Sequence, residues 1–225
     1  MKKFVMMASA WLVAGMVMAA DIQTNGNSVT IRPDGGQAKV ICLEVMNDNI
    51  IRVRATSEGS LPQKPQSLMI VPQKAPAKGS YTVSEEGGNV VVKAKNVKAV
   101  VDKATGEVAF FDAEGKQLLK ESKDGKQFKN FTVPEREYGL KGGPAITEEM
   151  KHGLTWQMKF DSPDDEAFYG LGQHQSEEFN MKGKNEDLFQ YNTKVSIPFV
   201  LSNRHYGILW DSYSYCRFGS PDDYL

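Results

Sequence analysis

The sequence contains few residues of the kinds that bind metals or form cross-links: two cysteines and three histidines among 225 residues. Cys42 and Cys216 belong to no Cys-x-x-Cys pair, and the histidines lie far apart in the chain, so no metal, redox or other cofactor motif is present. Two thiols do not make a disulfide-stapled scaffold of this length. We expect both to be buried apolar groups, with a bridge between them as the alternative.

The chain also lacks a charge excess and, beyond its first twenty residues, a long apolar run. It has 27 Lys and Arg against 28 Asp and Glu, for a formal net charge of −1. A nucleic-acid partner would require a clear basic excess, and a membrane-spanning helix requires about 20 apolar residues. We therefore expect neither a nucleic-acid partner nor a membrane span.

The first residues have the composition of an export signal. Lys2 and Lys3 form a basic start, residues 4–17 form an apolar stretch, and Val17-Met18-Ala19 has the small residues of a cleavage site. The sequence thus predicts a signal peptide over residues 1–19 and a mature chain over residues 20–225. Such a protein would be exported to the periplasm or to the cell surface.

Between residue 21 and about residue 121, short apolar runs alternate with turn residues, and helical spacing is absent. Ile51, Val53 and Ala55 alternate with two arginines, which is typical of a half-buried antiparallel strand. Turns that contain glycine separate the later runs at intervals of about ten residues, as in a meander. The predicted strands are residues 28–32, 38–45, 50–55, 81–84, 90–94, 97–102, 107–112 and 116–121. The proline-rich segment 57–79 is predicted to be an irregular connection, with an edge strand at 67–71 as an option.

The second half of the chain holds most of the aromatic residues. Strands are predicted at residues 154–160, 167–171, 197–201, 206–210 and 213–218, and the polar segment 173–194 is predicted to be a loop. The fold class is therefore all-β, an antiparallel β-sandwich. Four aromatic residues on strand patterns are expected in the core: Trp156, Phe160, Phe199 and Trp210. Three loop aromatics are better candidates for stacking on a sugar ring: Phe179, Phe189 and Tyr191.

An ordered series of motifs over about fifty residues resembles a known family. The motifs are Phe168-Tyr169-Gly170-Leu171-Gly172-Gln173, Gln190-Tyr191-Asn192-Thr193, Ile197-Pro198-Phe199 and Tyr206-Gly207-Ile208-Leu209-Trp210. They resemble the N-terminal β-sandwich domain of glycoside hydrolase family 31, and within it exported bacterial α-xylosidases that degrade xyloglucan. The resemblance implies a galactose-mutarotase-like sandwich over residues 20–225. It also implies hydrolysis, with retention, of terminal α-xylosyl bonds in an oligosaccharide of the xyloglucan type, with α-glucosyl bonds as the alternative.

The family's catalytic part is missing from this sequence. Members carry the nucleophile in a Trp-x-Asp-Met-Asn-type motif on a (β/α)₈ barrel, whereas Trp210-Asp211 is followed here by Ser212 and Tyr213. A complete barrel of about 250 residues could not fit into the chain. The resemblance therefore implies a truncated enzyme whose partner is the missing C-terminal barrel. No catalytic residue is placed in this chain, and the fragment alone is predicted to be inactive.

The resemblance also implies that a loop of the sandwich reaches the substrate pocket. The matching positions are Gln190, Tyr191 and Asn192, with Gln173 and His174 as second choices. Amide groups donate and accept hydrogen bonds at once, which suits paired sugar hydroxyls, and Tyr191 adds a stacking face. The alternative is that these side chains only satisfy backbone groups of the loop.

Two other functions stay open at this stage. A stand-alone carbohydrate-binding module would bind oligosaccharides without a barrel. A mutarotase-like epimerase would need a histidine and a carboxylate at one sugar ring, and His174 with Glu177 or Glu178 is the nearby candidate.

Overall fold

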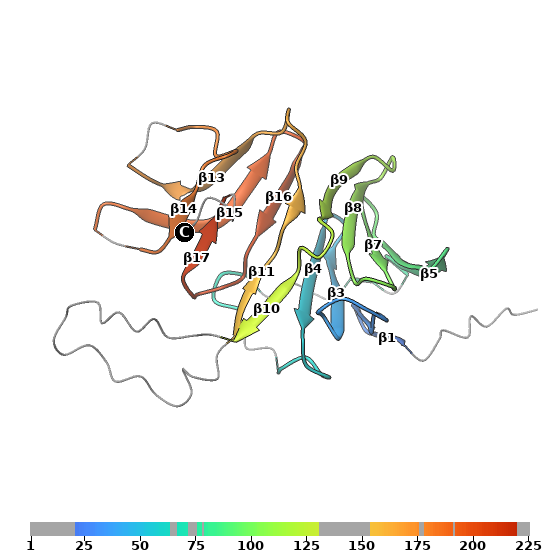
Figure 1. Cartoon of the computed structure of the whole chain (residues 1–225). Helices are drawn as coiled ribbons and strands as arrows, with labels where there is room; N and C mark the ends of the chain where they lie inside the picture. Colours follow the sequence, from blue (N-terminus) through green and yellow to red (C-terminus); the bar gives the residue numbers. More distant parts are fainter. Residues whose placement is uncertain are drawn as a thin grey trace, which may run out of the picture.

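Antiparallel strands form all of the sheets in the part of the chain that the structure describes (Figure 1). The computed structural model describes residues 21–63, 67–71, 76–77, 79–130, 154–175, 178–190 and 192–219. No helix occurs in these ranges, and the predicted all-β class is confirmed. The strands are β1 (Ile22–Asn25), β2 (Ser28–Ile31), β3 (Val40–Asn47), β4 (Ile50–Thr56), β5 (Thr82–Glu86), β6 (Asn89–Lys93), β7 (Val97–Asp102), β8 (Val108–Asp112), β9 (Gln117–Glu121), β10 (Gln127–Asn130), β11 (Leu154–Gln157), β12 (Phe160–Asp161), β13 (Phe168–Gln173), β14 (Glu186–Leu188), β15 (Val195–Ser202), β16 (Tyr206–Leu209) and β17 (Cys216–Phe218).

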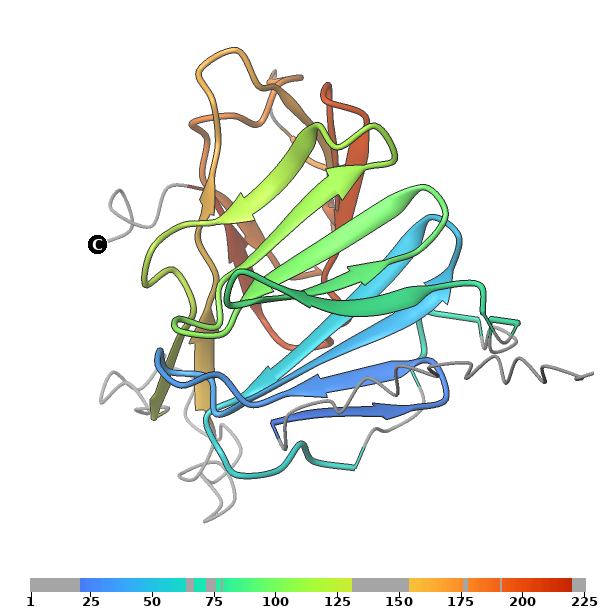
Figure 2. The ribbon, with the colours of Figure 1, turned by 90° about the vertical axis from the view of Figure 1, so that its right-hand side faces the viewer.

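Two sheets, blue and green in Figure 2, share the larger core. The first has the order β1-β2-β3-β4 and the second β12-β9-β8-β7-β6-β5. Alternate residues of β3, such as Ile41 and Leu43, are fully buried against Val90 of β6 and Val101 of β7. Val90 and Val101 are register partners, so their side chains lie on one face of the second sheet. The period-two pattern of the sequence thus becomes a sandwich core.

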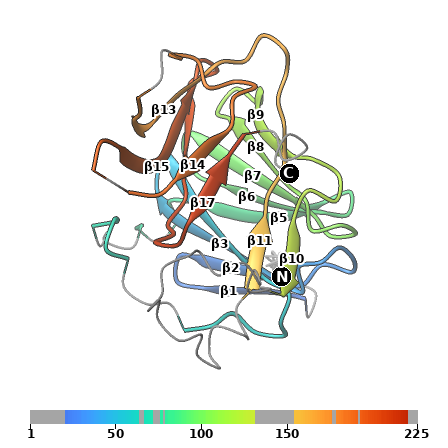
Figure 3. The same ribbon diagram turned by 60° about the vertical axis from the view of Figure 1, so that its left-hand side comes forward.

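A second, smaller core lies between the sheet β13-β15-β16 and the two-stranded ribbon β14–β17. Figure 3 shows this ribbon in front of β13 and β15. Leu171 and Val200 from the sheet are almost completely buried, and Leu188 of β14 packs against them. Phe218 of β17 makes edge-to-face contacts with Phe168 and Trp210. This packing fixes the ribbon on the sheet that carries the resemblance motifs.

Several predicted boundaries were wrong. Segment 173–194, predicted as loop, contains β14, a three-residue strand whose partner β17 lies far along the chain. Two of its three residues are acidic, so no apolar period revealed it. Strands β1 and β10 were missed, segment 67–71 forms no strand, and the predicted strand 154–160 is divided between β11 and β12.

The predicted burial of individual side chains was partly correct. Trp156, expected in the core, is 49% exposed because β11 belongs to a two-stranded ribbon that covers it only partly. Phe160, Phe199 and Trp210 are half-buried. Both cysteines are free thiols, Cys42 buried and Cys216 half-buried, so the bridge is excluded. Burial raises the pKa of the Cys42 thiol, and the nearby Glu44 carboxylate raises it further.

One face of the sheet β13-β15-β16 carries exposed apolar side chains. Val195, Ile197, Leu201 and Leu209 are each between 43% and 50% exposed. Phe199 pairs with Leu209 across the two strands, and residues two apart on a strand share a face, so these side chains lie on one side of the sheet. The opposite side contributes Val200 and Ile208 to the smaller core.

Candidate functional site

The site predicted by the sequence begins at a bulge in β13 that only glycines can make. Gly170 and Gly172 have φ angles of 125° and 105°, and the pairing of β13 with β15 shifts between them. A Cβ atom on Gly170 would lie 2.7 Å from the Phe199 oxygen, and one on Gly172 only 2.0 Å from the Val195 oxygen. Leu171 between them adopts φ 66° and is completely buried. The glycines therefore allow a turned backbone to lie directly against β15.

His174 follows this bulge, and each of its two ring nitrogens contacts another residue. Nε2 donates to the Leu171 carbonyl oxygen at 2.7 Å, and Nδ1 lies 3.1 Å from Oε1 of Glu186. The side chain is only 7% exposed. His174 thus joins the end of β13 to Glu186 of β14, and its contact with substrate stays a prediction.

The Glu186 carboxylate also holds Lys194, whose side chain is almost as buried as that of His174. The Lys194 ammonium donates to Glu186 and to the backbone oxygen of Asp187. A buried ammonium is stable only when paired, so Glu186 is what allows Lys194 to be buried at the start of β15. The ion pair of Glu186 with Lys194 joins the two ends of segment 186–194, in which Gln190, Tyr191 and Asn192 lie, and the contact with His174 ties this segment to the end of β13.

The predicted substrate-loop residues have unequal contacts. Gln190 is exposed, and its Oε1 accepts a hydrogen bond from the Ser196 backbone N–H at 3.1 Å. Gln173 is exposed and pairs in register with Val195, so the two glutamines lie at the same end of β15. Asn192 is also exposed, and Tyr191 lies outside the described residues. The structure therefore brings together two of the predicted amides, those of Gln173 and Gln190. The Gln190 amide also accepts a hydrogen bond from the backbone.

Of the two carboxylates considered for an epimerase, the described one, Glu178, has a partner other than His174. Glu178 forms an exposed ion pair with Lys184 at 3.0 Å, and hydrogen bonding to that lysine lowers the pKa of Glu178. His174 contacts Glu186 instead, and Glu177 lies outside the described residues. A histidine with one nitrogen bonded to a carbonyl and the other facing a carboxylate is poorly placed to take a proton from a sugar. The geometry gives no support to the epimerase alternative.

Two buried carboxylates have structural partners. Glu166, 2% exposed, accepts hydrogen bonds from the hydroxyl groups of Ser162, Ser202 and Tyr206. Burial, and then the neighbouring Glu166 carboxylate, raise the pKa of Tyr206 far above its usual range. Glu121, also 2% exposed, forms an ion pair with Lys126 at 2.9 Å and accepts from the Val108 backbone N–H.

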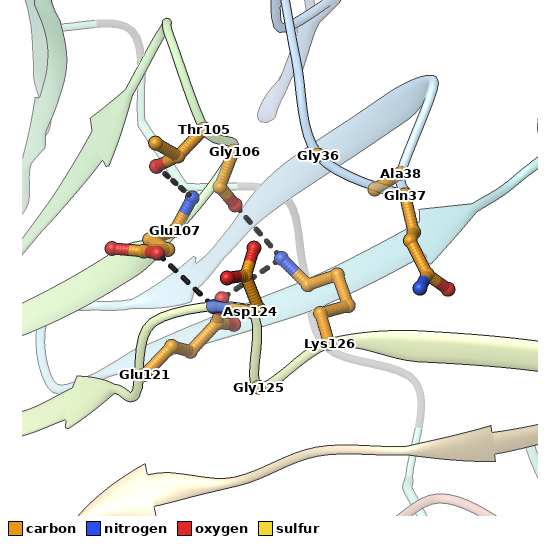
Figure 4. A pocket seen from close by; sticks show the side chains of 10 residues that line it. All are labelled: Gly36, Gln37, Ala38, Thr105, Gly106, Glu107, Glu121, Asp124, Gly125 and Lys126. Atoms are coloured by element: carbon orange, nitrogen blue, oxygen red, sulfur yellow. Dashed lines mark hydrogen bonds and ion pairs between the residues drawn. The ribbon is translucent and has the colours of Figure 1, made fainter.

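The Glu121–Lys126 pair lines a small hollow between turns of the two sandwich sheets (Figure 4). Lys126 points into it, where its ammonium also donates to the Gly106 carbonyl oxygen at 2.9 Å. Burial raises the pKa of Glu121, although Lys126 acts in the opposite direction. Because both charges are already paired and held by backbone groups, this hollow belongs to the packing of the sandwich.

Asp211 has structural partners, and the described residues contain no arrangement of metal ligands. Asp211, which follows Trp210, accepts from Arg52 at 2.6 Å and from the Ser67 hydroxyl at 2.7 Å, and so ties β4 to the chain beyond β16. No group of three or more His, Cys, Asp or Glu side chains in the described ranges is arranged to hold a metal ion. Nor do those ranges contain a helix long and apolar enough to cross a lipid bilayer.

Sequence reasoning missed the outward face of the β14–β17 ribbon. Asp187 pairs in register with Arg217, and Phe189 and Tyr215 follow on the same face. The Tyr215 hydroxyl donates to Asp187 at 2.6 Å and accepts from Arg217 at 2.7 Å. The rings of Phe189 and Tyr215 lie 6.1 Å apart and are about half exposed. Phe189 was singled out from its sequence, but its three companions become neighbours only through the unpredicted strand β14.

The antiparallel sheets, the two cores and the polar loop beside the glycine bulge define a β-sandwich domain of the galactose mutarotase-like class. A family model described as the glycosyl hydrolase 31 N-terminal galactose mutarotase-like domain matches residues 40–218. The chain therefore belongs to glycoside hydrolase family 31, and it corresponds to the N-terminal domain of that family's enzymes.

Curated relatives have names that agree with this assignment. An uncharacterized family 31 glucosidase of Pseudescherichia vulneris is 28% identical over 192 residues, which cover 78% of this chain and 33% of that protein. An α-xylosidase of Saccharolobus solfataricus is 40% identical over 67 residues, which cover 26% of this chain and 9% of the relative.

Solved structures give the same result. The family 31 α-xylosidase of Xanthomonas citri is 36% identical with a TM-score of 0.74, and the match covers 88% of this chain and 20% of that one. An α-xylosidase from a soil metagenome, solved with xylose, is 25% identical with a TM-score of 0.65, covering 88% and 29% of the two chains. This chain thus spans about a third or less of the relatives that it matches.

Proposed function

We propose that this chain is the N-terminal part of a longer, exported glycoside hydrolase that removes terminal α-xylosyl residues from oligosaccharides of the xyloglucan type. The observation that carries the proposal is the likeness to the Xanthomonas citri α-xylosidase, at 36% identity and a TM-score of 0.74 over 88% of the chain. The full enzyme would work with retention, through a glycosyl-enzyme intermediate formed on carboxylates outside this chain.

In this proposal the chain supplies a scaffold and one wall of the substrate pocket. The exposed apolar face formed by Val195, Ile197, Leu201 and Leu209 provides a surface against which a (β/α)₈ barrel could pack. Gln190 and Asn192, exposed next to that face, would donate and accept hydrogen bonds from sugar hydroxyls. The contacts of Glu186 with His174 and Lys194 would hold this loop in place.

The test is a hydrolysis assay of the longer protein that the gene encodes when translation continues beyond the codon for Leu225. It should release aryl alcohol from an aryl α-xyloside with a kcat/KM at least about tenfold above that for the matching α-glucoside. In the same assay Asn192→Ala should raise KM, with a smaller effect on kcat. A preference for the glucoside would contradict the xylosyl assignment, and a stop codon directly after Leu225 would contradict the proposal as a whole.

Export is tested on the same protein. After expression with its own leader, the protein recovered outside the cytoplasm should begin at Ala20, which N-terminal sequencing would show. A protein that keeps residues 1–19 and stays in the cytoplasm would overturn this part of the proposal.

A further inference from the structure

We propose that the outward face of the β14–β17 ribbon, formed by Asp187, Phe189, Tyr215 and Arg217, binds a sugar ring of an oligosaccharide. We call these four side chains the ribbon face. The inference rests on the proposed function, because it assigns a further contact for the same class of substrate. It concerns residues beyond the Gln190 to Asn192 loop, and it requires no catalytic residue in this chain.

The ribbon face is aromatic at one end and charged at the other. Phe189 is 48% and Tyr215 is 53% exposed, and their rings are tilted by 59° at a centroid distance of 6.1 Å. The two exposed rings thus offer apolar surface on the outward face of the ribbon. A pyranose presents C–H groups on its faces and hydroxyl groups around its rim, so it can contact a ring with one and a polar group with the other.

The polar half of the face is held in place before any ligand arrives. Arg217 Nε lies 3.2 Å from Asp187 Oδ1, and the Tyr215 hydroxyl is bonded to both residues. The Arg217 guanidinium also lies over the Tyr215 ring, 5.5 Å from its centroid. A carboxylate and a guanidinium fixed side by side offer both acceptors and donors to the hydroxyl groups of a sugar. Because these contacts already restrict the rotamers, binding would cost little side-chain entropy.

The position of the ribbon face favours an oligosaccharide over a protein partner. Gln190 directly follows Phe189, and the Lys194 ammonium lies 5.8 Å from the Phe189 ring, so the face is continuous with the predicted substrate loop. The inward side of the same ribbon, with Leu188 and Phe218, is committed to the smaller core. The apolar side chains suited to protein docking lie instead on β15 and β16.

The experiment is a binding titration of the chain itself with xyloglucan heptasaccharide, isomaltotriose and free xylose, followed by NMR and calorimetry. We expect saturable binding of the heptasaccharide. Tyr215→Ala and Phe189→Ala should each weaken it by about tenfold, the loss of one stacking contact. Tyr215→Phe keeps the ring but loses the hydroxyl bonds to Asp187 and Arg217, so it should weaken binding by less than Tyr215→Ala does. Trp156→Ala is the matched control, because Trp156 is 49% exposed, much like Phe189 and Tyr215, but belongs to β11 and lies outside the ribbon face.

Each other outcome would overturn the inference. These outcomes are absence of binding by the original chain, equal binding by Tyr215→Ala and Phe189→Ala, and an equal loss in Trp156→Ala. Binding of isomaltotriose alone would keep a sugar site but change the substrate class. Thermal melting of every variant shows that it is folded, and Arg217→Gln provides a second, milder change of the same face. Since binding needs no turnover, failure of the longer protein to hydrolyse α-xylosides would leave this result interpretable.

Discussion

Replacing Gly172 with alanine should destabilise the chain by about 3 kcal/mol or more, because the new methyl group has no room and the backbone angle is wrong. The added Cβ would lie 2.0 Å from the Val195 carbonyl oxygen, and φ at this position is 105°. To relieve this clash, β13 must move away from β15, and that movement would also displace Gln173 and His174. Urea unfolding of the variant and the original chain measures the change.

Gly115→Ala is the matched control for this effect. Gly115 has a φ of 88°, but an added Cβ would meet no atom within 4 Å. It should therefore show only the cost of a left-handed backbone, about 1–2 kcal/mol. Equal losses in the two variants would mean that the close approach of β13 to β15 is not what requires glycine at position 172.

Lys126→Met should cost about 3–5 kcal/mol, because it leaves the Glu121 carboxylate buried without its counter-charge. Glu121 is 2% exposed, and the Lys126 side chain is 9% exposed, so little water reaches either group. The double variant Glu121→Leu, Lys126→Met removes both charges and should recover most of the loss. Lys120→Met is the control, since its partner Asp161 lies 3.9 Å away and both side chains are about half exposed. This change should stay within about 0.5 kcal/mol.

The loss in Lys126→Met should depend on pH in a defined direction. Burial raises the pKa of Glu121 above its unfolded value even with Lys126 present. A raised folded-state pKa means that the group's contribution is fully present below the unfolded pKa and is lost as pH rises through the folded one. Without Lys126 the pKa should rise further, so the variant should be closer to the original chain at about pH 5 than at about pH 8. A larger deficit at the lower pH would contradict this account of Glu121.

The sandwich could be predicted from the sequence because its physical signals are local. Alternation in β4, and turns built around Gly106 and Gly115, are set by neighbouring residues, and the strands lie where those patterns place them. Strand β14 could not be found in this way. It has three residues, two of them acidic, and it exists because β17 pairs with it and Leu188 packs into the smaller core.

The candidate site could also be predicted only in part from the sequence. Gln173 and Gln190 were identified through their resemblance motifs, and the structure places them at one end of β15. His174 was predicted to contact substrate, which stays a prediction, and its contacts with Leu171 and Glu186 were not foreseen. Those contacts depend on the bulge of β13 and on the pairing of Glu186 with Lys194, which are properties of the folded chain. Tyr215 gave no signal, because its relation to Asp187 and Phe189 is set by strand register.

The most direct measurement of the central claim is an aryl α-xyloside assay on the purified chain without any following polypeptide. The account predicts no release above background at any protein concentration, because the proposed function assigns the carboxylate pair that cleaves the glycosidic bond to another part of the enzyme. Release that increases in proportion to the amount of chain, and is absent from a mock purification, would show that these sheets carry a catalytic centre of their own.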